Sequence, residues 1–245
     1  MQIRPNKQAV EALYSKLKEA LVREEREGIH VSDLLQLRQA YWKRINPLPP
    51  TDDEVGYWLA GKAHHYFLVQ AVTGINDSQE ASLIDIETGI HYSPDLLELK
   101  GEFKTSRWAI LPTTEDQAMR AVSTYIPQCR AYAALMNTLN WNLYVFYLTA
   151  LDFHTRRKIP RLKVYTFEFT HEELQAEREG LHERATLLEN AVKELSCESL
   201  PLCSEYLCFR MQGHGRGKRR TIEGVCKWWE QCKPEGRYIT SGATK

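Results

Sequence analysis

Two carboxylates and one lysine near the middle of the chain combine residue types and a spacing that could do hydrolytic chemistry. Asp95 and Glu102 are numbered symmetrically about the point between Glu98 and Leu99, so a hairpin centred there places them directly opposite each other. Directly opposed residues of an antiparallel pair project to the same face, with Cβ atoms about 5 Å apart. Lys104 follows two residues after Glu102 and shares that face.

Such a group of side chains favours a divalent metal site. Two like charges held opposite each other destabilise a fold unless something compensates them, and a divalent cation does so. Mg²⁺ prefers a few carboxylates with retained waters and substrate phosphate oxygens, and it can polarise a phosphodiester and activate a water. We therefore expect Asp95 and Glu102 to hold Mg²⁺ or Mn²⁺, and Lys104 to act on the attacking water or on developing phosphate charge.

A second triplet of the same composition, Glu98-Leu-Lys100, competes with Glu102-Phe-Lys104. Glu98 is an odd number of residues from Asp95, so on one strand the two side chains would point to opposite faces. The second triplet is therefore excluded from the predicted site.

Hydrophobic periodicity and turn residues predict the elements that position these side chains. Helices are expected over 8–24, 33–44 and 54–72, from a capping box at Thr114 to about Leu139, and over 171–195. Strands are expected over 82–87, 90–97, 102–111, 141–150 and 162–170, with 141–150 buried on both faces. This order of elements predicts an α/β fold with a mixed central sheet flanked by helices.

The central segment resembles a known superfamily of nucleases. Pro94-Asp95 followed by Glu102-x-Lys104 matches the PD-(D/E)XK pattern, and the Lys-Thr-Ser sequence that begins at Lys104 is similar to RecB-like members. The match is strengthened by two further motifs in the order that the family has them, so the resemblance covers residues 61–132. The RecB-like branch includes CRISPR-associated spacer-acquisition nucleases.

The two further motifs lie on predicted helices on either side of the hairpin. Gly61 and His65 resemble the G-x-x-x-H element of the family, which implies that His65 is a metal ligand. Gln128 and Tyr132 resemble the Q-x-x-x-Y motif, whose members orient the active site and DNA. Each motif also has an ordinary explanation, because helix histidines and residue pairs four apart on a helix often make plain structural contacts.

The resemblance implies a restriction-endonuclease-like core and a metal-dependent deoxyribonuclease that acts in DNA processing, recombination, or CRISPR- or phage-related DNA metabolism. It leaves open whether the enzyme is an exonuclease or an endonuclease, whether its DNA is single- or double-stranded, and whether it works within a larger DNA-processing complex. The alternative function is a catalytically silent nucleic-acid-binding or assembly protein on the same fold. For the triplet itself, the other interpretation is that Asp95 and Glu102 are solvent-facing hairpin residues with Lys104 as a cross-strand partner.

Five of the six cysteines fall in the last 49 residues, a clustering that favours metal binding over disulfides in a cytosolic protein. Cys203 and Cys208, with Cys226 and Cys232, form two short pairs that suit structural Zn²⁺ or a [4Fe-4S] cluster, with Cys197 as an alternative ligand. In RecB-like nucleases with such a cluster, one cysteine precedes the core, whereas no cysteine precedes residue 129 in this chain. Reduced thiols without a metal are the alternative.

The cysteine distribution predicts two parts, a nuclease core with N-terminal helices over 1–196 and a cysteine-rich C-terminal cap over 197–245. Between the cysteine pairs lies a basic, glycine-rich stretch whose charged members could contact phosphates of a nucleic acid. These residues are Arg216, Lys218, Arg219 and Arg220. A solvated loop is the other interpretation of this stretch.

The overall composition supports a folded protein but not, by itself, a DNA partner. Hydrophobic residues make up 43% of the chain, enough to bury a full core, and the 32 basic and 32 acidic residues cancel. No stretch of 18 apolar residues predicts a membrane span, and the N-terminal residues lack the apolar region of a secretory signal. We therefore expect a cytoplasmic, intracellular protein without a membrane partner.

Overall fold

A computed structural model of the 245-residue chain describes residues 7–21, 27–73, 82–106, 108, 110–152, 156–158, 160–201, 209–212, 221–224, 226 and 228. The chain forms two compact units. Met1–Val31 with Pro49–His182 makes up the first unit, and Ser32–Leu48 with Glu183–Lys245 makes up the second. The expected division into 1–196 and 197–245 stays a prediction.

The helices follow the apolar spacing of the sequence, with two breaks. They are α1 (Lys7–Leu21), α2 (Val31–Leu34), α3 (Leu37–Ile45), α4 (Asp52–Thr73), α5 (Glu115–Val122), α6 (Ile126–Leu135) and α7 (His171–Glu194). The helix expected over 33–44 is divided into α2 and α3, and the helix expected from Thr114 to Leu139 is divided into α5 and α6. Pro127 in the first turn of α6 explains the second break, because proline is favoured where a helix begins and its ring opposes a continuing helix.

Side-chain caps begin two helices of the first unit. Thr114 caps α5, as expected, by accepting a hydrogen bond from the Gln117 backbone N–H at 3.3 Å. Thr51 and Glu54 form a reciprocal capping box at the start of α4, with distances of 2.8 and 3.2 Å. These caps set where the helices that flank the central sheet begin.

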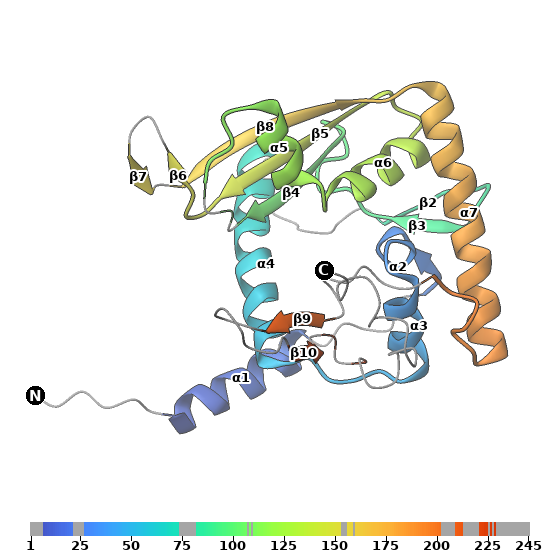
Figure 1. Cartoon of the computed structure of the whole chain (residues 1–245), viewed down its shortest axis with the longest axis horizontal. Coiled ribbons are helices and arrows are strands. Elements are labelled where there is room, and N and C mark those ends of the chain that lie inside the picture. Colours follow the sequence, from blue (N-terminus) through green and yellow to red (C-terminus); the bar gives the residue numbers. More distant parts are fainter. Residues whose placement is uncertain are drawn as a thin grey trace, which may run out of the picture. The chain divides into compact units, whose positions relative to one another are not determined.

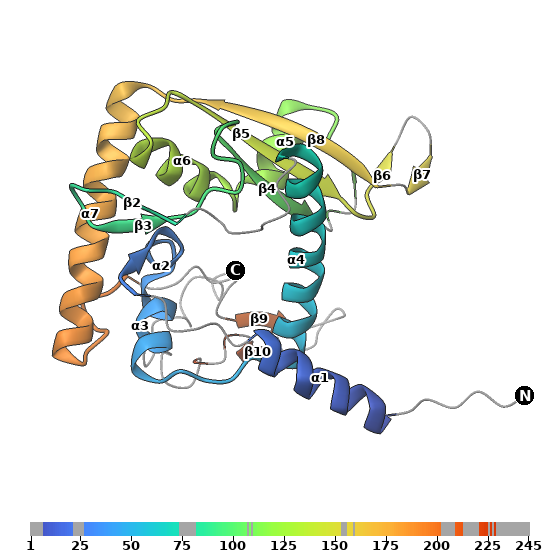
Figure 2. The same ribbon diagram turned by 180° about the vertical axis from the view of Figure 1, so that it is seen from behind.

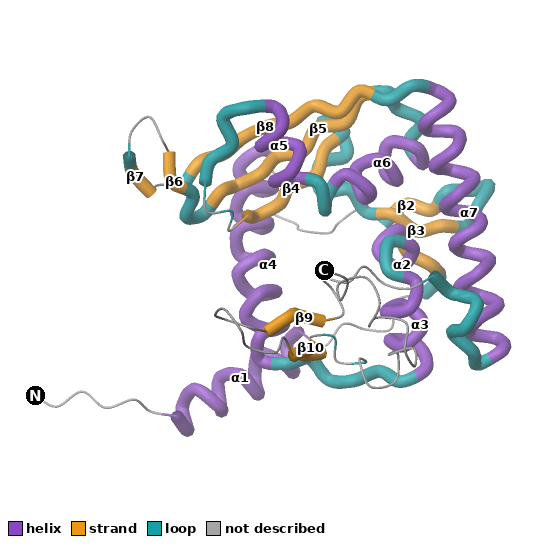
Figure 3. Tube along the Cα trace, in the orientation of Figure 1, coloured by secondary structure: helices purple, strands orange, loops and turns teal. Residues whose placement is uncertain are grey.

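The strands described are β1 (Ile29–His30), β2 (Leu83–Ile84), β3 (Ile90–Tyr92), β4 (Gly101–Ser106), β5 (Asn140–Tyr147), β6 (Leu151–Asp152), β7 (Arg157–Lys158), β8 (Arg161–Glu168), β9 (Phe209–Gln212) and β10 (Thr221–Gly224). In the central sheet, β4 runs parallel to β5, and β8 runs antiparallel to β5 (Figure 3). The protein is therefore of the mixed α/β class, and its central sheet is mixed, as expected.

The central sheet has helices on both faces. Figures 1 and 2 show α4 against one face and α5 and α6 against the other. Trp141 of β5 packs against Tyr132 of α6 at a centroid distance of 5.8 Å, whereas Phe146 lies 5.8 Å from His64 of α4. β5 alternates between buried residues on the α6 side and mostly half-buried residues on the α4 side, so the expected burial of both faces is wrong. Covering by α4 is partial, because apolar residues of β8 on that face are exposed.

A small sheet in the order β1-β3-β2 precedes the central sheet in the chain. The turn at Thr88-Gly89, between the strands expected over 82–87 and 90–97, joins β2 to β3. Asp85 Oδ2 accepts hydrogen bonds from the Thr88 backbone N–H at 2.9 Å and from its hydroxyl at 2.6 Å. Gly89 has a φ of +68°, a conformation that glycine adopts without strain. The strands are shorter than expected, since β3 ends at Tyr92.

In the second unit, α3 contacts the segment that follows α7. Arg38 is 7% exposed, and its Nε donates to the Leu200 carbonyl at 3.0 Å while its Nη1 lies 3.9 Å from Cys197 Sγ. Trp228 Nε1 donates to the Asn46 carbonyl at 2.9 Å. The C-terminal segment therefore has contacts with α3 that the sequence alone does not predict.

Among the helices in the described part of the chain, none is both long enough and apolar enough to span a membrane.

Candidate active site

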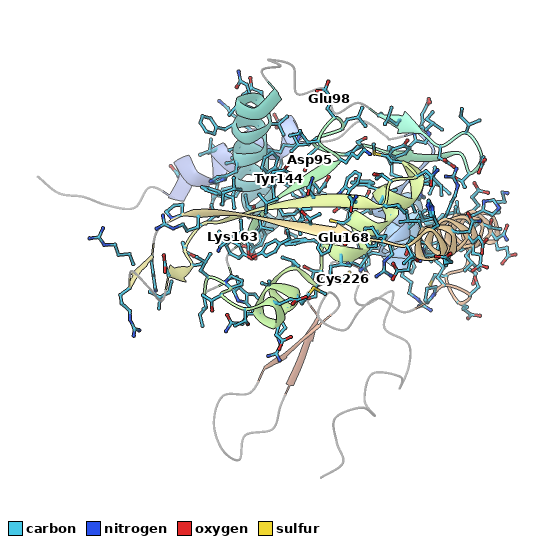
Figure 4. All side chains as sticks on the ribbon, turned by 90° about the horizontal axis from the view of Figure 1, so that it is seen from above. Asp95, Glu98, Tyr144, Lys163, Glu168 and Cys226 are labelled. Carbon is cyan, nitrogen blue, oxygen red and sulfur yellow. The ribbon has the colours of Figure 1, made fainter. Side chains whose placement is uncertain are left out.

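The hairpin that carries the two carboxylates has the centre that the sequence predicts. Leu96 and Gly101 exchange two backbone hydrogen bonds at 3.1 and 3.0 Å, and this pair is symmetric about the same point as Asp95 and Glu102. Glu98 lies at the exposed turn, farther from the sheet than Asp95 (Figure 4). The excluded triplet therefore lies outside the site.

Pro94 marks the point where the backbone ladder of this hairpin ends. The next pair of ladder bonds would join Pro94 and Phe103, but Pro94 has no N–H to donate, and the Phe103 N–H donates to Asp95 Oδ2 at 2.8 Å instead. In the other direction, the Asp95 N–H donates to Glu102 Oε2 at 3.3 Å. Each acidic side chain thus accepts an N–H from the opposite segment, an arrangement that holds the two carboxylates side by side.

Gly101 allows β4 to approach β5 closely at the start of the strand. A Cβ at this position would lie 2.8 Å from Tyr144 Cε2 and 3.1 Å from the Asn142 carbonyl oxygen. Gly101 pairs directly with Asn142 in the parallel ladder, so this approach sets the register of the whole strand. The glycine before the acidic residue is therefore required by packing.

Glu102 is 2% exposed and is surrounded by donors. Its Oε1 accepts hydrogen bonds from Lys104 Nζ at 2.6 Å and from Gln128 Nε2 at 2.9 Å. Gln128 Nε2 also donates to the Tyr132 hydroxyl at 3.0 Å, and that hydroxyl donates to the Ser93 carbonyl at 3.4 Å. Four predicted motif residues, Glu102 and Lys104 on β4 with Gln128 and Tyr132 on α6, therefore form one connected network.

Burial and the charge of the ion-pair partner shift the pKa values of Glu102 and Lys104 in opposite directions. Burial raises the pKa of Glu102 to about 7; the Lys104 ammonium opposes this rise, and the Asp95 carboxylate adds to it. Burial alone would lower the pKa of Lys104, but the charges of Glu102 and Asp95 outweigh it and raise this pKa above its ordinary value. Lys104 therefore stays protonated, and further positive charge beside the two carboxylates would favour ionised Glu102.

The sheet register assigns the site to one face. Glu102 pairs with Leu143 and Lys104 with Val145, so these side chains share the face that α6 covers. His64 of α4 packs on Phe146, on the opposite face. His65 also lies on α4, but its side chain is outside the described part of the structure, so its role as a metal ligand stays a prediction.

The cysteine and basic-loop predictions lie mostly outside the described residues. The described residues do not include three of the predicted cysteine ligands or the four basic residues of the loop. These are Cys203, Cys208 and Cys232, with Arg216, Lys218, Arg219 and Arg220. Cys226 and Cys197 are described and half-buried, and Cys129 is buried on α6, as expected of a helix cysteine. The structure does not test the Zn²⁺ or iron–sulfur prediction.

The paired carboxylates fit a hard divalent cation. Glu102 and Asp95 supply oxygen ligands beside each other, and their combined charge exceeds that of Lys104. Among the described residues, no group of three or more His, Cys, Asp or Glu side chains could hold a metal. Mg²⁺ often binds through one or two carboxylates and completes its shell with waters and substrate phosphate oxygens, so two carboxylates are chemically sufficient.

Three contacts of this site were missed by reasoning from the sequence. The Ser93 carbonyl anchors the Tyr132 hydroxyl, and the Tyr92 ring lies 6.5 Å from the Tyr132 ring. Tyr125, in the turn between α5 and α6, donates to the Thr105 carbonyl at 3.4 Å. A backbone acceptor leaves no signal in residue type, so only the proximity of these residues to Pro94 and Gln128 could have suggested them.

Compared with models of known protein families, the chain matches none, and no curated protein matches it. Among solved structures, it is similar to the crystal structure of SSO0001, with a TM-score of 0.44 and 20% identity over 75% of this chain and 88% of that chain. It is also similar to a phage-related exonuclease from Haemophilus somnus 129PT, with a TM-score of 0.39 and 13% identity over 78% and 83% of the two chains. At TM-scores this low, neither likeness carries a conclusion about this chain.

Proposed function

We propose that the protein is a metal-dependent nuclease that hydrolyses phosphodiester bonds in DNA, on a PD-(D/E)XK core of the RecB-like branch. The observation that carries the proposal is the burial of Glu102, at 2% exposed, beside a second carboxylate, a lysine and an amide donor. A plain solvent-facing hairpin pair would leave these groups in water. Burying charge costs several kcal/mol per ion unless it is well paired, so such an arrangement favours a functional reason.

Asp95 and Glu102 would hold Mg²⁺ or Mn²⁺, with His65 as a further ligand. When bound there, the ion would supply Lewis-acid polarisation of the scissile phosphate. Lys104 is held protonated by Glu102 and Asp95, so it would orient the attacking water or neutralise charge that develops on the phosphate. Gln128 would hold Glu102 Oε1 in place, and Tyr132 would in turn hold Gln128.

The cysteine-rich segment would stabilise the fold of the second unit. Under this proposal its four paired cysteines bind structural Zn²⁺ or a [4Fe-4S] cluster, with Cys197 as an alternative ligand; they are Cys203, Cys208, Cys226 and Cys232. Arg38 beside Cys197 would support that segment from α3. The basic stretch between the cysteine pairs would contact DNA phosphates.

The proposal is tested by cleavage of end-labelled linear and circular DNA, both single-stranded and duplex, with Mg²⁺, Mn²⁺ or EDTA. We expect metal-dependent cleavage that Lys104→Ala abolishes and that Lys100→Ala, which removes an exposed lysine from the same hairpin, leaves intact. Cleavage of circles would identify an endonuclease, and cleavage of linear DNA alone an exonuclease. A folded parent that binds DNA but cuts none of these substrates would overturn the proposal in favour of a non-catalytic binding protein.

A further inference from the structure

Basic side chains gather over β6, β7 and the start of β8, away from the motifs of the proposed active site. Between Leu151 and Lys163 the chain has five basic residues and a single acidic residue, Asp152, in a protein whose formal net charge is zero. The basic residues are Arg156, Arg157, Lys158, Arg161 and Lys163. The first three are exposed, and the last two are half-buried. We call these five residues the basic hairpin.

The basic hairpin is joined to the strand that carries the proposed catalytic residues. β6 pairs antiparallel with β7, so Leu151 lies opposite Lys158 and Asp152 opposite Arg157. Ile110, four residues after the end of β4, forms a parallel bridge with Leu151, and the Leu111 N–H donates to the Leu151 carbonyl at 3.0 Å. The hairpin is therefore held against the chain that leaves the site.

The register of the central sheet relates the basic residues of β8 to Lys104. Lys104 pairs with Val145, which pairs with Lys163, so the two lysines lie in one row on the same face of the sheet. Two strand spacings separate their Cα atoms by about 10 Å. Figure 4 shows Lys163 and Tyr144 on opposite sides of the sheet, as this register requires. Arg161 lies in the next row of that face, opposite Tyr147.

Arg161 is held by a nearly buried acid. Its Nη2 lies 3.7 Å from Asp152 Oδ2, and the Asp152 side chain is 12% exposed. Exposed arginines and lysines at a fixed place on a sheet are the groups that bind phosphate oxygens of nucleic acids without reading the bases. Their excess of positive charge is complementary to a polyanion.

We infer that the basic hairpin binds the sugar–phosphate backbone of DNA a few nucleotides from the bond to be cut. The inference rests on the proposed nuclease function, because it places the substrate of that site. It also explains how a chain with no net charge can bind a polyanion: the local field over the hairpin matters, and the total charge does not. The hairpin positions the strand, and Lys104 meets the reacting phosphate.

The test measures binding of a fluorescent single-stranded and a duplex DNA by anisotropy over a series of salt concentrations, without added divalent cations. The full-length double variant Arg157→Gln/Lys158→Gln is compared with Lys16→Gln/Lys193→Gln, which removes the same charge from exposed positions on α1 and α7. We expect about tenfold weaker binding for the hairpin variant at low salt, and a slope of log K against log salt that is smaller by about 1.4 to 1.8. The control should bind as the parent does.

Equal binding by the two double variants would overturn the inference, even if the parent cleaves DNA and Lys104→Ala does not. Loss of binding in the hairpin variant would support it even if no cleavage is found, so failure of the inference and failure of the proposed nuclease are distinguishable. A parent that binds anionic lipid vesicles through the hairpin but does not bind DNA would also overturn it. Far-UV circular dichroism of each variant confirms that the fold is retained.

Discussion

Two Glu-x-Lys triplets lie four residues apart on the same hairpin, and their surroundings differ. Glu98 and Lys100 occupy the exposed turn, where Lys100 adopts a φ of +46°. Glu102 is 2% exposed and bonded to Lys104, whose side chain is 24% exposed. Exposed ion pairs contribute about 0 to 1 kcal/mol to stability, whereas a buried charge costs several kcal/mol unless it is paired. Identical residue types therefore acquire different surroundings from their place on the hairpin and from the packing of α6 over one of them.

The largest difference between variants of the two triplets is expected in the rate of DNA cleavage. Glu102→Gln removes a charge from the proposed metal site, so kcat/KM for DNA cleavage should fall by about 10²-fold or more, on the scale of losing one transition-state-stabilising group. Glu98→Gln removes the same charge from the turn and should change kcat/KM by less than about twofold. Steady-state cleavage rates at saturating Mn²⁺ measure both. Equal losses in the two variants would show that the register does not distinguish the triplets.

The next effect concerns the glycine that brings β4 against β5. Gly101→Ala places a Cβ 2.8 Å from Tyr144 Cε2, and such overpacking should lower the free energy of unfolding by about 1 to 3 kcal/mol. Gly61→Ala is the matched control, because no atom lies within 4 Å of its added Cβ on α4, and it should stabilise the protein by about 0.5 to 1 kcal/mol. Urea unfolding gives both free energies. If Gly101→Ala left the free energy of unfolding unchanged, the close approach of β4 to β5 at Gly101 would be contradicted.

A smaller effect is expected at Tyr132, which links Gln128 to the Ser93 carbonyl. Tyr132→Phe removes both hydrogen bonds of its hydroxyl, so the free energy of unfolding should fall by about 1 to 2 kcal/mol. Tyr66→Phe on α4, 47% exposed, should leave it unchanged within about 0.5 kcal/mol. Thermal or urea unfolding measures the free energy of unfolding of both variants. Equal stabilities would show that the hydrogen bonds of the Tyr132 hydroxyl do not stabilise the fold.

A final effect, on neither catalysis nor stability, is a difference in the rate of labelling at Cys129, a neighbour of the site on α6. Burial raises the pKa of this thiol to about 12, and the Glu102 charge adds to the rise. Because the thiolate is the reactive form, alkylation of native protein at pH 8 should be far slower at Cys129 than after unfolding in urea. Peptide mapping by mass spectrometry reports the modified site. Rapid labelling of the native protein would show that the surroundings of Glu102 are open to water.

Local features of this hairpin could be predicted, and its burial could not. The numbering of Asp95 and Glu102 predicts their pairing, because hairpin partners are symmetric about the turn, and Leu96 with Gly101 confirms the same centre. The contact between Gln128 and Glu102 depends on how α6 packs on the sheet, over a separation of 26 residues. No local pattern encodes such packing; only the resemblance to a family suggested that these motifs meet.

Other errors have identifiable physical causes. Tyr144 and Phe146 make β5 a dense apolar run, but α4 covers their face only in part, so apolar composition overstated burial. The two-residue strands β6 and β7 are too short to show alternation, and the basic hairpin was therefore not predicted. The break before α6 follows from Pro127, whose ring opposes a continuous helix through this position.

The most direct test of the central claim is Mn²⁺ binding to the folded parent, Asp95→Asn and Glu98→Gln proteins, measured by titration calorimetry. Oxygen ligands favour Mn²⁺, so the carboxylate pair should bind it in preference to the cysteine-rich segment. If Asp95 and Glu102 hold the metal, the parent and Glu98→Gln proteins bind Mn²⁺ with equal affinity, and Asp95→Asn binds it at least about tenfold more weakly. Unchanged affinity in Asp95→Asn, or no binding by the folded parent, would contradict a metal centre at this pair.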